Sequence, residues 1–282
     1  MLKKAYYLSV LLFFISQFSD AQSFYNKGRN RKLVANGGFG VASYYGDLNN
    51  PGDIIDFTPD ITFGARYEIN NMVSVGMNLA WFMLRGDDAE ADTEGRERRN
   101  LSFRSHNVEL SVLGFIDLYP RGKRFYQRPI VGPYAYFGIG LLYYNPQAEL
   151  EGSYYSLRPL QTEGNSYSIF TPTIPLGFGL RFRATPFINV VLEGGYRITF
   201  TDYLDDVSTV YIDNSTFDDP IARQLADRRP EIGLPLKEAG SVRGNPEKND
   251  GYFITSLKVE IYLPDILFEP NPYRGRGFRR RR

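Results

Sequence analysis

Three aspartates lie close together in the stretch TDYLDDVSTVY, residues 201–211, and carboxylates grouped in this way can bind a cation. Asp202, Asp205 and Asp206, together with Asp213, could supply the oxygen ligands that Ca²⁺ prefers. Their spacing does not match the calcium-binding loop of an EF-hand. We therefore favour an acidic cluster that is solvated or packed within a loop, with a calcium site as the alternative.

Residues suited to catalysis are scarce. The chain has one histidine, His106, and no cysteine. By its position in an alternating run, His106 shares the apolar face with Val108 and Leu110. A general base on this face would point at lipid and not at a polar substrate. No G-x-S-x-G, H-E-x-x-H, Walker or Rossmann pattern occurs. The sequence predicts a protein that is not an enzyme and holds no cofactor or metal; a lipid-modifying enzyme that uses His106 is the alternative.

The overall charge and composition narrow the class of protein. Lys plus Arg number 33 against 32 for Asp plus Glu, a balance that argues against a nucleic-acid partner. The absence of cysteine excludes disulfides, thiolate metal sites and a lipid-modified N-terminal cysteine. High counts of glycine, tyrosine and phenylalanine favour β-sheet over helix bundles.

The first 21 residues have the pattern of a secretory signal peptide. Lys3 and Lys4 provide the positive charges, and Ala5–Phe18 is an apolar run too short to cross a bilayer as a helix. Small residues then precede a cleavage site before Gln22. We expect residues 1–21 to direct export from the cytoplasm and to be removed.

Strict alternation of apolar and polar residues dominates the rest of the chain. Between Ile61 and Ile69 every second residue is apolar, Asn70-Asn71 forms a turn signal, and the alternation resumes from Val73 to Met83. This pattern predicts a long β-hairpin. The same rhythm recurs in further runs at Leu33–Tyr45, His106–Leu118, Ala135–Tyr143, Ile174–Phe182, Ile188–Phe200 and Phe253–Leu263.

Strand length and loop order together indicate the architecture. About eight strands near the length that crosses a membrane at a tilt are joined by connections that are alternately long and short. The prediction is an all-β fold over residues 22–263: a transmembrane up-and-down antiparallel β-barrel in the outer membrane, with long extracellular loops and short periplasmic turns. A soluble β-barrel or sandwich also alternates, but its strands are usually shorter.

The polar face of these strands carries glycines and charges of both signs. In a narrow barrel this face points into the lumen, where glycine makes room and buried charges must pair. We predict that the lumen is filled by a paired polar plug; an ion-selective pore is the alternative. The residues assigned to this network are Arg66, Glu109, Arg181, Glu193, Arg197, Lys258 and Glu260.

Residues 264–282 follow the last predicted strand and form a basic C-terminal tail. We expect this tail in the periplasm, where it could dock on an acidic partner, peptidoglycan or anionic lipid, or could be a flexible extension without a contact. The residues that would make such a contact are Arg274, Arg276, Arg279, Arg280, Arg281 and Arg282.

Several motifs resemble one known family. TEG at 162–164, IPLGFG at 174–179, TDYLDDVSTVY and the signal peptide ending at Ala21-Gln22 are similar to the PorG-like outer-membrane barrels of the type IX secretion system in Bacteroidota. The resemblance covers essentially the whole mature chain, and TDYLDDVS is its most specific part. The signature residues are Asp202, Tyr203, Leu204, Asp205 and Asp206.

The resemblance implies a function that composition and spacing do not. PorG-like barrels are associated with the periplasmic ring of the PorK lipoprotein and PorN, which they are thought to tie to the outer membrane. We expect the signature residues at the outer rim to fold the loops, and the turn at 119–129 and the tail to contact the ring. The alternative is a stand-alone structural or small-solute barrel of the OmpA or OmpW type.

Overall fold

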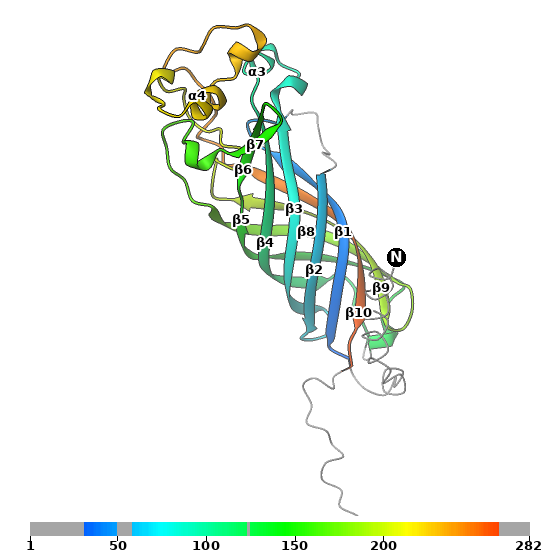
Figure 1. Ribbon diagram of the computed structural model, residues 1–282. Coiled ribbons are helices and arrows are strands. Elements are labelled where there is room, and N and C mark those ends of the chain that lie inside the picture. Colours follow the sequence, from blue (N-terminus) through cyan, green and yellow to red (C-terminus); the bar gives the residue numbers. More distant parts are fainter. Residues whose placement is uncertain (1–30, 50–57, 123–124, 265–282) are drawn as a thin grey trace, which may run out of the picture.

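The wall of the molecule is a closed antiparallel barrel of eight strands (Figure 1). The computed structural model describes residues 31–49, 58–122 and 125–264, so the predicted signal peptide and tail arginines lie outside the described residues. Neighbouring strands in the chain pair with one another, and β1 pairs with β10 to close the wall. The strands are β1 (Leu33–Tyr45), β2 (Thr58–Glu68), β3 (Val73–Asp87), β4 (Ser102–Asp117), β5 (Val131–Tyr143), β8 (Phe170–Arg183), β9 (Ile188–Thr199) and β10 (Gly251–Tyr262).

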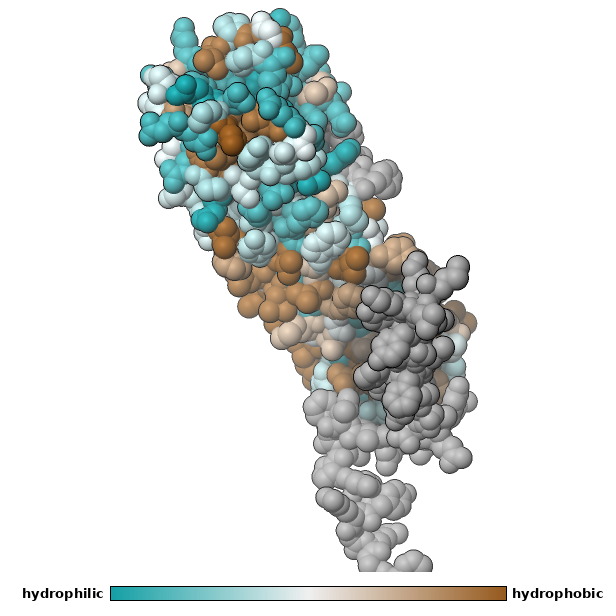
Figure 2. Space-filling model, in the orientation of Figure 1, coloured by the Kyte–Doolittle hydropathy of each residue, from teal (hydrophilic) through white to brown (hydrophobic). Residues whose placement is uncertain are grey.

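The apolar face of each strand points outward. Phe178, Ile139 and Phe39 leave 71%, 70% and 67% of their surface exposed, whereas the polar residues of the opposite face are buried in the lumen. On the face seen in Figure 2, hydrophobic residues form a brown band across the barrel below the cap. This is the reverse of a soluble barrel, so the predicted transmembrane barrel is confirmed.

Long and short connections separate to opposite rims. The turns 69–72, 118–130 and 184–187 lie at the rim where β1 begins and β10 ends, which is the periplasmic side. In the β2–β3 turn, Asn70 Oδ1 accepts hydrogen bonds from the amides of Met72 and Val73, both 2.8 Å long. The long loops gather at the other, extracellular rim.

The strands extend further on the extracellular side than the alternation predicted. β3 continues to Asp87, β4 already begins at Ser102 and β8 at Phe170. Beyond the hydrocarbon the outward face meets water and carries Arg85 and Asp87, while the inward face holds the buried Leu84 and Phe103. The apolar face therefore changes from outward to inward there, although the hydrogen-bond ladder continues. A further hairpin, β6 (Pro146–Leu150) and β7 (Ser153–Ser156), lies in the segment expected to be a loop and pairs with β4.

The extracellular loops fold into a compact cap, which is hydrophilic outside (Figure 2). Within it, Asp219 caps α4 by accepting a hydrogen bond from the Ile221 amide at 2.9 Å, and Pro220 occupies the first turn. Among the described residues, no helix is long and apolar enough to span a membrane. The cap helices are η1 (Asp88–Glu90), α3 (Glu94–Glu97), η3 (Arg158–Leu160), η4 (Asn214–Thr216), α4 (Pro220–Ala226) and η5 (Arg229–Ile232); η2 (Phe125–Gln127) lies at the periplasmic rim.

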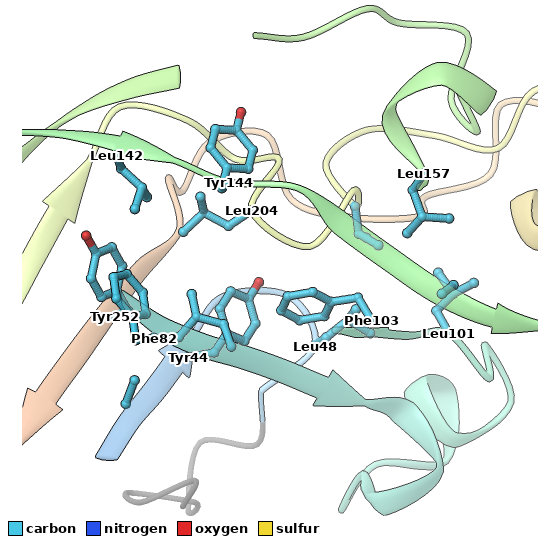
Figure 3. Packing of buried hydrophobic residues seen from close by; sticks show 14 of the residues in the cluster. Tyr44, Leu48, Phe82, Leu101, Phe103, Leu142, Tyr144, Leu157, Leu204 and Tyr252 are labelled. Carbon is cyan, nitrogen blue, oxygen red and sulfur yellow. The ribbon is translucent and has the colours of Figure 1, made fainter. Parts of the chain in front are cut away.

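A hydrophobic core joins the cap to the barrel mouth (Figure 3). Tyr44 and Phe82 from the wall pack in one cluster with Leu101 and Leu204 from the loops, and all four are buried. Tyr44 and Phe103 meet edge to face at 4.9 Å. The cap is therefore an integral part of the fold rather than a set of independent loops.

Candidate functional site

The two most specific motifs of the sequence meet in the cap. Glu163, from TEG, directs its carboxylate at the backbone that follows the aspartates: Oε1 accepts from the Ser208 amide at 3.0 Å, and Oε2 from the Thr209 amide at 2.9 Å. The Thr209 hydroxyl donates a further bond of 2.6 Å to Oε2. One carboxylate thus holds the end of the signature stretch in place.

Arg243 completes this junction. Its Nη1 lies 2.8 Å from Glu163 Oε1 and 2.6 Å from the carbonyl oxygen of Asp206, and both side chains of the ion pair are buried. Burial opposes ionisation of Glu163, but the charge of Arg243 and the hydrogen bonds outweigh it and lower the pKa of the carboxyl. Arg243 was not singled out from the sequence, because nothing local connects it to a residue 80 positions earlier.

Asp206 is held in an uncommon backbone conformation. Its φ is +68°, in the left-handed region that aspartate tolerates better than most residues. The carboxylate accepts hydrogen bonds of 2.5 Å from both the Thr162 and the Tyr167 hydroxyls. Burial raises the pKa of Asp206 to about 6, although Arg243 opposes the shift. Thr162 lies directly before Glu163, so the TEG segment contacts the signature stretch at two points.

The remaining signature residues pack into the same unit. The Tyr203 ring stacks on Tyr167 with centroids 4.7 Å apart, and Leu204 is buried in the core of Figure 3. Asp205 accepts a hydrogen bond from the Val207 amide at 2.9 Å and one from the Tyr44 hydroxyl at 2.7 Å. Burial raises the pKa of Asp202 to about 7. The structure therefore brings all five signature residues together in or beside one buried cluster.

The aspartates considered as calcium ligands are not arranged around a common position. Among the residues described, no group of three or more acidic or histidine side chains is placed to hold a metal ion. Asp213, the fourth aspartate considered, instead caps η4 by accepting from the Ser215 amide at 2.9 Å. Asp205, Asp206 and Asp213 make hydrogen bonds to hydroxyls and backbone amides, which are the contacts of a folded loop, whereas neither carboxylate oxygen of the buried Asp202 has a hydrogen-bond partner among the described residues.

Inside the barrel the charges form two layers. In the periplasmic layer, Glu260 lies 2.9 Å from Arg66 and 3.3 Å from Arg181. Arg181 also pairs with Asp117, and the Asn189 amide donates to Glu260 at 2.8 Å. Every one of these side chains is buried. Asp117 and Asn189 share the lumen parity of their strands, and this is the signal by which the sequence could have included them.

The extracellular layer of the lumen contains the other four predicted residues. Lys258 Nζ lies 2.5 Å from Glu193 Oε1, and the Tyr134 hydroxyl donates to Glu193 Oε2 at 2.7 Å. Glu109 accepts from the Tyr252 hydroxyl at 2.5 Å, but its separation from Arg197 is 3.9 Å. A Cβ on the lumen residue Gly179 would fall 2.2 Å from the Tyr134 ring. Glycine therefore leaves the space that an inward tyrosine fills.

The outward face carries the only histidine of the sequence. His106 stacks on Trp81 with centroids 5.8 Å apart and planes 14° apart. Met83 lies opposite His106 in the β3–β4 ladder, and Arg85 opposite Arg104 two residues further out. The change from apolar to charged residues marks the outer membrane interface at this level. Here His106 occupies an aromatic interfacial position.

At the periplasmic rim, two arginines of the 118–130 connection fasten the neighbouring turns. Arg121 donates to the carbonyl of Asn70 at 3.0 Å and pairs with Glu68 at 2.6 Å. Arg128 donates to the carbonyl of Pro186 at 2.9 Å and to that of Thr185 at 3.1 Å. The connection therefore links the β2–β3 turn to the β8–β9 turn across the rim.

Comparison with known proteins identifies the family. Residues 7–218 match the outer membrane protein beta-barrel domain. Solved structures with a similar fold include the N-terminal β-barrel domain of Pseudomonas aeruginosa OprF, at 10% identity and a TM-score of 0.39 over 83% of this chain and 98% of that chain. Neisserial surface protein A is 12% identical with a TM-score of 0.40, over 82% of this chain and 97% of that one.

A major outer membrane protein from Thermus thermophilus is 14% identical with a TM-score of 0.40, over 83% of this chain and 99% of that chain. No curated protein matches the sequence. The family match covers most of the chain, including seven barrel strands and the signature stretch. The chain belongs to the outer-membrane β-barrel protein family and resides in the outer membrane.

Proposed function

We propose that this barrel is a non-catalytic component of the type IX protein secretion machinery of Bacteroidota that anchors the periplasmic PorK/PorN ring to the outer membrane. The observation that carries the proposal is the contact between TEG and TDYLDDVS, the motifs that resemble PorG-like barrels. Glu163 and Thr162 bind the backbone and the Asp206 carboxylate of the second motif. Two separate matches in sequence thus belong to one structural unit.

The lumen supports an anchoring role rather than transport. Two layers of paired charges and inward tyrosines occupy the space between the strands, which is narrow in an eight-stranded barrel. On the extracellular side the cap core packs directly on the barrel mouth. A barrel whose lumen is filled in this way can act as a rigid membrane anchor that does not conduct a solute.

The periplasmic rim is the surface proposed to meet the ring. Leu118, Tyr119 and Ile130 expose 58%, 60% and 67% of their surface there, while Arg121 and Arg128 are used within the rim. In the described part of this turn the exposed contact surface is therefore mainly apolar, with Gln127 also exposed. The basic tail, with Arg274, Arg276 and Arg279–Arg282, lies outside the described residues and is proposed as the second contact.

The test is cross-linking and co-purification from native membranes. Tyr119→Ser and a chain that ends at Pro264 should each reduce recovery of PorK and PorN, and their combination should reduce it most. Tyr154→Ser, a matched exposed tyrosine on the extracellular hairpin, serves as the control. Heat-modifiable gel migration verifies that each variant still forms a barrel. Unchanged recovery in the combined variant would contradict the proposed contact surface.

A stand-alone barrel of the OmpA or OmpW type is the second candidate. It is consistent with the family match to an outer membrane protein beta-barrel domain. The test uses cells that contain PorK and PorN and that are treated with a cross-linker before purification. If the wild-type barrel then purifies without PorK and PorN, the stand-alone barrel is the correct candidate. Solute uptake by proteoliposomes that contain the barrel would further assign it a transport role.

A further inference from the structure

Two buried carboxyls of the cap share one tyrosine hydroxyl. The Oη atom of Tyr44, at the end of β1, lies 2.7 Å from Asp205 Oδ2 and 2.8 Å from Asp250 Oδ1. A phenol has a single hydrogen and can donate to only one of them. The second contact is a hydrogen bond only if that carboxyl is protonated and donates to Tyr44. The geometry therefore requires one proton more than two ionised aspartates would provide.

The other oxygen of each carboxyl is also occupied. Asp250 Oδ2 accepts from the Leu204 amide, and Asp205 Oδ1 from the Val207 amide, both at 2.9 Å. The bridge thus fixes the backbone of the signature stretch on both sides. It connects this stretch to Tyr44 in β1, which is 161 positions before Asp205, and to Asp250, which directly precedes β10 and is 206 positions after Tyr44.

The surroundings do not neutralise two negative charges. Arg99 is the cation that faces Asp205, but its guanidinium already binds Asp88 at 2.6 and 2.8 Å. Asp47 faces Asp205, and Asp202 faces Asp250, so each adds negative charge. The phenols of Tyr144 and Tyr196 also face Asp250.

Burial is the main cause that raises the pKa of Asp205 well above its usual value, with Asp47 adding to the shift. Burial likewise raises the pKa of Asp250, and the charges of Asp205 and Asp202 add to it. Space at the bridge is also limited, because a Cβ on Gly46 would fall 1.9 Å from both Asp250 Oδ1 and Tyr44 Oη. Larger groups are thus excluded from this side.

We propose that the proton shared by Asp205, Tyr44 and Asp250 is a fastener of the extracellular cap, and that its loss at alkaline pH loosens the cap from the barrel mouth. The sign follows from proton linkage. Carboxyls with a raised pKa in the folded cap bind the proton more tightly there than in the opened cap. The stabilising effect of the protonated carboxyls is therefore complete at acidic pH, and it is lost as the pH rises through their pKa in the folded cap.

A side-chain amide at position 205 or 250 should supply the hydrogen-bond donor that the shared proton provides in the wild type. In Asp250→Asn the side-chain oxygen can accept from the Leu204 amide, while its NH₂ group donates to Tyr44 and the Tyr44 hydroxyl donates to Asp205. Asp205→Asn satisfies the same count through Val207. Both variants should keep the cap closed without a titrating proton. Tyr44→Phe removes the bridge itself and should loosen the cap at every pH.

The experiment is hydrogen exchange of the Leu204 and Val207 amides in lipid nanodiscs, corrected for intrinsic exchange, from pH 5 to 9.5. In the wild type, protection should fall by about tenfold per pH unit over the range in which the closed cap still holds the shared proton and the opened cap does not, and it should level off once the closed cap has lost the proton. The difference from Asp250→Asn isolates the bridge, because Asp202 and Asp206 titrate in both proteins. Asp213→Asn changes an exposed cap aspartate and should follow the wild type.

Two results would overturn the proposal. One is an identical pH profile for the wild type and Asp250→Asn, since the bridge would then hold no titrating proton. The other is loss of protection on adding EDTA at constant pH and its recovery with Ca²⁺, because a cation rather than a proton would then join the carboxyls. Barrel amides such as that of Leu79 provide the reference, and their protection should not change.

Discussion

Glu163 is the residue whose replacement should most directly loosen the signature stretch within the cap. In Glu163→Gln the side chain keeps one acceptor oxygen, so it cannot satisfy the Ser208 and Thr209 amides as well as the Thr209 hydroxyl. Arg243 also loses its buried counter-charge; both partners of this pair are only 2% exposed. Removing one member of such a buried pair costs about 3–5 kcal/mol.

This cost converts into a measurable change in exchange. At about 1.4 kcal/mol per factor of ten, the Ser208 and Thr209 amides should exchange between about a hundredfold and a few thousandfold faster. The lumen pairs lie on other strands, so barrel amides should keep their protection. Native-state hydrogen exchange in nanodiscs at constant pH reads both regions in the same sample.

A surface pair in the same cap provides the control. Glu94 and Arg98 form an ion pair one helical turn apart, but their side chains are 73% and 60% exposed. Glu94→Gln should therefore change cap stability by less than about 1 kcal/mol. If Glu163→Gln and Glu94→Gln affected exchange at Ser208 equally, the reasoning that Glu163 fastens the signature stretch would be refuted.

Three further predictions concern the lumen, the acidic stretch and the membrane band. Lys258→Met leaves Glu193 buried without its cation and should lower the free energy of unfolding in lipid by about 3–5 kcal/mol. The double variant Lys258→Met/Glu193→Leu removes both charges and should recover part of this loss. Urea titration measures the stability of the two variants, and equal losses would contradict the pairing. The pKa of Asp206, raised by burial to about 6 from about 3.9, means that its stabilising effect is complete below pH 4 and lost as the pH rises through 6. Proteolysis of the cap should accelerate over that interval in the wild type but less in Asp206→Asn; parallel profiles would contradict this assignment. Trp81, the sole tryptophan, should be quenched more by lipids brominated near the headgroup than by lipids brominated near the chain end, and an absence of quenching would contradict its outward position.

The sequence predicted the wall of the barrel because one physical rule governs every strand. A residue two positions along returns to the same face, so Phe63 and Met77 could be assigned to the outside and Arg66 to the inside without a structure. Parity does not specify partners across the lumen. That Glu260 meets both Arg66 and Arg181 depends on strand tilt and register, which only the closed barrel determines.

The cap was less predictable for a related reason. Its contacts join positions far apart in the chain, such as Glu163 with Arg243 and Tyr44 with Asp250, and no local period connects them. The hairpin β6–β7 was missed because it lies beyond the hydrocarbon, where neither face must be apolar. The stretch TDYLDDVS was recognisable as a motif, but its role as a buried fastener appears only when its partners are placed.

The β1–β10 seam has a consequence for biogenesis. Twelve residue pairs join the first strand to the last, so closure brings together positions separated by more than 200 residues. Contacts of such long range are slow to form. The Tyr44–Asp250 contact spans the same seam, so this contact of the cap forms only when β1 and the start of β10 have come together. An intact Tyr44–Asp250 contact on the extracellular side is thus a mark that the first and last strands have paired.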